Sequence, residues 1–61
     1  MTIYDNIKRL CDEKGLSIAR VERRAGLGNR VIAGWKYSSP RVDSLKRVAD
    51  VLEVSINELI I

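Results

Sequence analysis

The chain has 61 residues, enough for a single domain that spans residues 1–61 and buries about 60% of the surface of its unfolded state. With 46% hydrophobic and 31% charged residues, it has the composition of a folded globular protein, which excludes disordered, fibrous and membrane classes. No apolar run approaches the roughly 18 residues that span a bilayer, and the start of the chain lacks a secretion signal, so we expect a cytoplasmic protein without membrane contacts.

The net charge of +3 is concentrated in the middle of the chain. Between residues 20 and 47, eight basic residues stand against two acidic ones, a net charge of +6, whereas the preceding segment is neutral and the following one carries −3. The basic residues are Arg20, Arg23, Arg24, Arg30, Lys36, Arg41, Lys46 and Arg47. Such a stretch attracts polyanions, but a merely solvated surface has the same charge, so both interpretations remain open at this point.

Cap and turn residues divide the chain into five short helices without a convincing strand, so the predicted fold class is all-α. The first helix, about residues 3–14, is predicted from a capping box of Thr2 and Asp5 and from Gly15 as its left-handed end. Its apolar stripe consists of Ile3, Ile7, Leu10 and Cys11. Because Cys11 falls in this stripe, we interpret it as a small core residue and not as a reactive thiol. A lone cysteine without any histidine leaves too few ligands for a zinc site, so no metal or cofactor is expected.

The second helix begins after Ser17, a favourable N-cap, and ends at Gly26. Its apolar face is formed by Ile18, Val21 and Ala25. Only residues 26–28 separate it from a third helix, and two helices joined so tightly cross steeply.

The third helix is predicted to begin near Asn29 and to turn Ile32 and Trp35 inward. A loop over residues 37–40 follows, because the residue before Pro40 is disfavoured in a helix.

The fourth helix, about residues 42–52, has apolar residues at steps of three and four. These are Val42, Leu45, Val48, Ala49 and Leu52. A last helix is predicted from reciprocal capping by Ser55 and Glu58, with Ile56, Leu59 and Ile60 facing inward or toward a partner.

The most informative pattern is the pair formed by the second and third helices. Gly26 permits the positive φ of the turn between them, and apolar residues hold the two helices together: Val21, Ala25, Leu27, Ile32 and Trp35. This arrangement leaves Asn29 and Arg30 projecting at the start of the third helix. A helix that projects in this way fits the major groove of B-DNA, although a plain helical hairpin in an all-α core has the same spacing.

Further landmarks accompany this pair: Gly15-Leu16-Ser17, Ala25-Gly26-Leu27, Ile32-x-x-Trp35, Pro40-x-x-Asp43-x-Leu45-x-x-Val48-Ala49-x-x-Leu52 and Val54-Ser55-x-x-Glu58-Leu59. Through them, residues 16–61 resemble the lambda-repressor-like, Cro/CI-type (XRE) helix-turn-helix family, and with the first helix the resemblance covers nearly the whole chain. It implies a compact five-helix domain in which helices two and three form the helix-turn-helix and two copies often bind a two-fold DNA operator.

The resemblance also implies a set of DNA contacts. Base contacts are expected from Asn29, Arg30 and Gly34, with Ala33 close enough to meet a thymine methyl group. Phosphate contacts are expected from Ser17, Lys36, Tyr37 and Arg41.

Five residues depart from the family pattern. Gly28 stands at the N-cap of the third helix, where serine or threonine is usual, although glycine is a tolerable N-cap. Ile18 stands where a glutamine often contacts the DNA backbone, so that contact is not expected. Glu22 stands where alanine is common against the third helix, which requires either solvent exposure or a cationic partner. Lys36 replaces a common glutamate, so the frequent ion pair to the first helix is expected to be absent. Gly34 costs about 1 kcal/mol inside a helix, and either close approach of the backbone to DNA or loss of a base-contacting function explains it.

We therefore expect a sequence-specific regulator of transcription that binds double-stranded DNA, of the phage or prophage repressor kind. Because the chain stops directly after the fifth helix, a small Cro-like or stand-alone repressor is favoured. The apolar end Leu59-Ile60-Ile61, next to Ile56, suggests a weak homodimer or a dimer on DNA.

Two other functions compete with DNA binding. An enzyme is not expected, because the chain lacks histidine, a phosphate-binding glycine loop and a nucleophile with a positioned base. An antirepressor or antitoxin-like module that binds another protein, such as another repressor, remains the alternative. Salt dependence separates the two, since binding to phosphates weakens steeply as salt rises.

Overall fold

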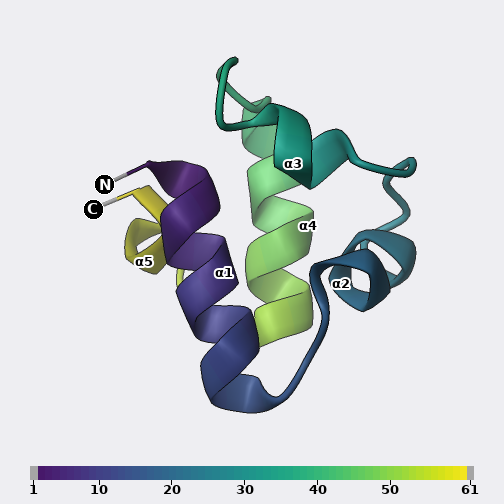
Figure 1. Cartoon of the computed structure of the whole chain (residues 1–61). Coiled ribbons are helices and arrows are strands. Elements are labelled where there is room, and N and C mark those ends of the chain that lie inside the picture. Colours follow the sequence, from purple (N-terminus) through teal and green to yellow (C-terminus); the bar gives the residue numbers. More distant parts are fainter. Residues whose placement is uncertain (1, 61) are drawn as a thin grey trace.

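Five helices follow one another in the computed structural model, which describes residues 2–60 (Figure 1). They are α1 (Ile3–Lys14), α2 (Ile18–Arg24), α3 (Val31–Gly34), α4 (Val42–Leu52) and α5 (Asn57–Ile60). Figure 1 shows α5 beside α1, and α2 beside α4, in agreement with the contacts between these pairs. Residues 2–60 contain no strand, so the all-α prediction is confirmed. No helix in this part of the chain is long and apolar enough to cross a membrane.

The start of α1 has the predicted capping box. The Asp5 N–H donates to the Thr2 hydroxyl and the Thr2 N–H donates to the Asp5 carboxylate, each over 3.1 Å. The bond from the Thr2 N–H is the main cause that lowers the pKa of the Asp5 carboxyl, and the Thr2 side chain lowers it further. Gly15 ends the helix with a φ of 69°, as predicted.

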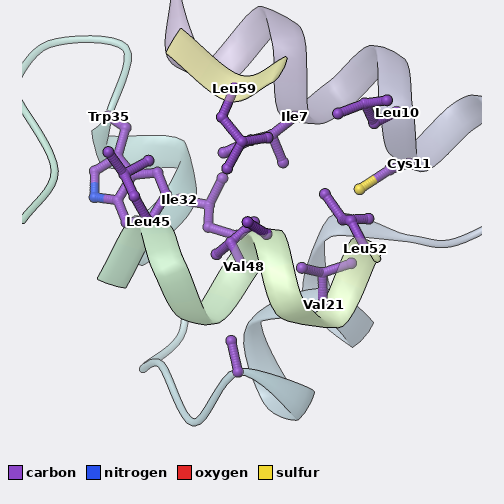
Figure 2. Packing of buried hydrophobic residues seen from close by; sticks show 12 residues of the cluster. Ile7, Leu10, Cys11, Val21, Ile32, Trp35, Leu45, Val48, Leu52 and Leu59 are labelled. Atoms are coloured by element: carbon purple, nitrogen blue, oxygen red, sulfur yellow. The ribbon is translucent and has the colours of Figure 1, made fainter. Parts of the chain in front are cut away.

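A single apolar core lies between the helices (Figure 2). Its buried members are Ile7, Leu10, Cys11, Val21, Ala25, Ile32, Trp35, Leu45, Val48, Ala49, Leu52 and Leu59. Cys11 is the core residue that its place in the stripe predicted, and burial raises the pKa of its thiol. Trp35 is only 8% exposed, as predicted.

Val42 does not belong to the buried face of α4. It is 74% exposed, although its spacing from Leu45 and Ala49 placed it in the same stripe. Val42 is the first residue of α4 and directly follows the N-cap, Arg41. The apolar periodicity extends back to the first residue of the helix, but the core does not extend that far.

Two buried polar residues, Asn6 and Glu22, were absent from the predicted core. Asn6 lies on the inner side of α1, and its side-chain amide donates to the Leu59 carbonyl of α5 over 2.7 Å. A polar residue between apolar positions gives no sequence signal of burial, because its partner is 53 residues away. This bond ties the two ends of the fold together.

The last helix begins later than its predicted cap, Ser55, implies, because α5 starts only at Asn57. The Ser55 N–H donates to the Glu58 carboxylate over 3.3 Å, whereas the Glu58 N–H donates to the main-chain carbonyl of Ser55 and not to its hydroxyl. Leu59 is buried, while Ile60 is 51% exposed. Ile61, the end of the predicted apolar patch, lies outside the described residues.

Candidate nucleic-acid interface

The first part of the candidate interface is α2. Ser17 caps it as predicted, with its hydroxyl accepting from the Arg20 N–H over 3.1 Å. Ile18 is half-buried against the core, so its side chain belongs to the fold. The exposed face of α2 carries Arg20, Arg23 and Arg24.

The turn after α2 has the predicted glycine geometry. Gly26 adopts a φ of 74°, which a residue with a side chain adopts only with strain. The Leu27 N–H donates to the Glu22 carbonyl over 2.9 Å, which closes the end of α2, and the Leu27 side chain packs against the core. This turn therefore fixes the direction in which the chain leaves α2.

The start of α3 differs from the prediction. The helix begins at Val31, two residues later than expected, and its N-cap is Arg30 and not Gly28. Arg30 has a φ of 63° and a ψ of 15°, the left-handed conformation. Residues 29 and 30 therefore form a turn that precedes α3 and do not belong to its first helical turn.

Glu22 explains this start, and the expectation that it needs solvent or a cation was wrong. It is 6% exposed, and its carboxylate accepts from the Ile32 N–H over 2.8 Å and from the Arg30 N–H over 3.4 Å. The first N–H groups of a helix have no partner within the helix and carry a partial positive charge. These N–H groups supply the hydrogen bonds and the positive charge that a cation was expected to supply to the Glu22 carboxylate. Through this side chain, α2 caps α3.

The expected base-contacting residues lie within one short stretch of chain. Asn29 and Arg30 are exposed in the turn, Gly34 is exposed at the end of α3, and Ala33 is half-buried between them. A methyl group built on Gly34 would meet no neighbouring atom within 4 Å outside its own helix backbone. The packing of the protein therefore does not require a glycine at this position.

The expected phosphate-contacting residues come from three places. Ser17 and Arg41 are exposed at the N-caps of α2 and α4, and Arg41 pairs with Asp43 over 3.7 Å in a largely exposed ion pair. Lys36 and Tyr37 directly follow α3, and Tyr37 is 90% exposed. The Lys36 ammonium lies over the ring of Tyr4, a contact with α1 that sequence reasoning missed because it sought a charged partner.

Two short helices joined by a left-handed glycine turn, with exposed polar residues at the start of the second, define a helix-turn-helix DNA-binding domain. The Cro/C1-type HTH DNA-binding domain matches residues 6–61, and the chain belongs to this family. It is therefore a DNA-binding regulator whose partner is double-stranded DNA. Comparison with curated proteins and with solved structures found no match. Within residues 2–60 there is no pocket and no cluster of metal-binding side chains.

Proposed function

We propose that the protein is a sequence-specific transcriptional repressor, of the phage or prophage kind, that binds a two-fold operator with α3 in the major groove. The exposure of Asn29 and Arg30 at the start of α3 carries this proposal. These two side chains have no role in the core, while Ile32 and Trp35 of the same segment are buried and fix it to the domain.

The chemistry of these side chains assigns their partners. Asparagine presents a donor and an acceptor that match adenine N6 and N7, and arginine presents a donor fork that matches guanine O6 and N7. Each such pair discriminates against a wrong base by about 1 to 3 kcal/mol. Ala33 and Gly34 are the next positions along the groove, where a small side chain meets a thymine methyl group or lets the backbone approach.

The phosphate contacts need only a positive charge or a donor. Lys36, Tyr37 and Arg41 follow α3 and are all exposed, as is Ser17 at the start of α2. Phosphate contacts position a protein on the duplex and carry no sequence information themselves. Loss of one basic contact should therefore weaken binding to all sequences and flatten the salt dependence by about one unit.

A dimer on DNA is the second part of the proposal. Ile60 on α5 is 51% exposed, and an apolar contact between the two copies of this residue would suit a C2 pair. Half-sites should then lie about 34 Å, or 10 base pairs, apart. A selected site without an inverted repeat, in a complex that contains one protein chain, would contradict the dimer.

The test starts with selection of bound sites from a random duplex library. Binding of wild type, Arg30→Ala and Lys36→Ala to the selected operator and to scrambled DNA is then measured across a salt series. Arg30→Ala should reduce the operator's advantage over scrambled DNA, and Lys36→Ala should leave this ratio nearly unchanged. Arg9→Ala, an exposed cation paired with Glu13 on α1, is the matched control and should bind like wild type. A wild type without operator preference at low salt would contradict the proposal and favour the protein-binding alternative.

A further inference from the structure

The backbone of Arg30 is unusual for the start of a helix. The N-caps of α1, α2 and α4 are all extended, with φ between −92° and −76°, whereas Arg30 is left-handed. The other left-handed residue with a side chain within residues 2–60, Glu53, ends α4, where this conformation is common. Left-handed residues with side chains persist only where the surrounding structure holds them.

Glu22 is the group that holds Arg30. Both of its carboxylate oxygens accept bonds, one from the Arg30 N–H and the other from the Ile32 N–H. These two amides flank the point where the chain enters α3, so one buried side chain fixes the backbone on both sides of it. Arg30 makes no side-chain cap bond to its own helix, which leaves its guanidinium for another partner.

We propose that Glu22 is a positioning residue for base recognition: without touching DNA, it sets the direction in which Arg30 presents its guanidinium. This inference rests on the proposed function, in which Arg30 contacts a base. Bidentate recognition of guanine depends on the placement of the donor fork, because both donors must meet their acceptors at once. A turn that changes its backbone conformation loses this placement even where the fold is kept.

The variant that separates positioning from folding is Glu22→Gln. Glutamine has the same shape but offers one acceptor oxygen, and an amide nitrogen takes the place of the other. Its oxygen can keep the shorter bond to the Ile32 N–H, while the amide nitrogen faces the Arg30 N–H as a second donor. The start of α3 thus retains one cap, and the turn at Arg30 is released.

The experiment compares operator and scrambled DNA for wild type, Glu22→Gln, Arg30→Ala and the double variant. Glu22→Gln should reduce the operator's advantage by roughly 5- to 150-fold, the range of one bidentate base contact, with binding to scrambled DNA unchanged within about twofold. In the Arg30→Ala background the same change should have no further effect on the ratio. Glu13→Gln, the same substitution at an exposed position of α1, is the matched control and should behave as wild type.

Hydrogen exchange of the wild-type protein supplies a second measurement that needs no variant. The Arg30 and Ile32 amides should exchange more slowly than the Asn29 amide, for which no bond is seen. Rapid exchange at Arg30, or an unchanged operator ratio in a folded Glu22→Gln variant, would overturn the role of Glu22 while leaving the proposed function intact. A wild type without operator preference would overturn both. Equal losses on operator and scrambled DNA in both backgrounds would show a purely structural Glu22, which also contradicts the inference.

Discussion

The ammonium group of Lys36 lies 4.6 Å from the centroid of the Tyr4 ring. This contact joins α1 to the segment after α3. The ion pair that often joins these two parts in the family was expected to be absent, because position 36 is a lysine and not a glutamate. The face of an aromatic ring attracts a cation electrostatically. At an exposed site such a pair contributes about 0.5 to 1 kcal/mol to stability. The lysine thus connects the same two parts of the fold by a different interaction.

A double-mutant cycle with Tyr4→Leu and Lys36→Met tests this connection. Urea unfolding should give a coupling of about 0.5 to 1 kcal/mol between the two residues. Tyr4→Leu alone should keep DNA binding, because the ammonium remains free to meet a phosphate. Additive losses of stability would show that the two side chains do not interact in solution.

Gly34→Ala should stabilise the protein and weaken its binding to the operator. The added methyl group meets no neighbouring side chain, and alanine is favoured over glycine in a helix by about 1 kcal/mol. If the backbone of α3 approaches DNA closely at this position, the same methyl group separates the two surfaces. Thermal unfolding and operator affinity are measured on the same variant. A stabilised variant with full operator affinity would indicate that Gly34 has no function in binding.

Trp35→Ala should be largely unfolded. Truncation of a buried tryptophan costs about 3 to 5 kcal/mol, which is comparable with the whole stability of a domain this small. The measurement is the helical signal in far-ultraviolet circular dichroism at room temperature. Tyr37→Ala is the control, because this aromatic side chain is exposed and its loss should leave the signal unchanged. A folded Trp35→Ala variant would contradict the central place of this residue in the core.

Asn6→Ala should destabilise the docking of α5 on α1. It removes the donor to the Leu59 carbonyl, and a buried acceptor that loses its partner costs about 1 to 3 kcal/mol. Asn57→Ala makes the same change at an exposed position of α5 and should alter stability by less than about 0.5 kcal/mol. Equal unfolding midpoints for the two variants in urea would refute the importance of the Asn6 bond.

Asp5 gives a pH dependence of known sign. Because its pKa is lowered in the folded state by its bonds with Thr2, its contribution is present above the unfolded pKa of about 3.9 and is lost as the pH falls through the lower, folded value. The stability difference between wild type and Asp5→Asn should therefore vanish in acid. A difference that persists unchanged below this range would exclude the capping box as its cause.

Local patterns predicted most of the fold. The Thr2 and Asp5 cap, the Gly26 turn and the burial of Trp35 depend on residues close in sequence, and all three were predicted. The left-handed Arg30 and its bond from Glu22, eight residues away, depend on how α2 and α3 cross. No spacing rule contains that information, so the start of α3 was placed two residues too early and its cap was assigned to Gly28.

For the candidate site, the sequence predicted which residues are exposed, but it did not predict the contacts that hold them in place. The exposure of Asn29, Arg30 and Gly34 follows from the helix-turn-helix pattern and the family resemblance. The interaction of Lys36 with Tyr4 does not, because it depends on a side chain of α1 that the pattern leaves unspecified.

The shortness of α3 has a consequence for how affinity responds to mutation. A single helical turn of four residues cannot pay its nucleation cost alone, so a synthetic peptide of residues 28–38 should be a random coil with little affinity for any duplex. The residues expected to contact DNA are therefore held in place only in the fraction of molecules whose domain is folded. Substitutions deep in the core, remote from any nucleotide, will therefore lower the apparent operator affinity in proportion to the population that they unfold.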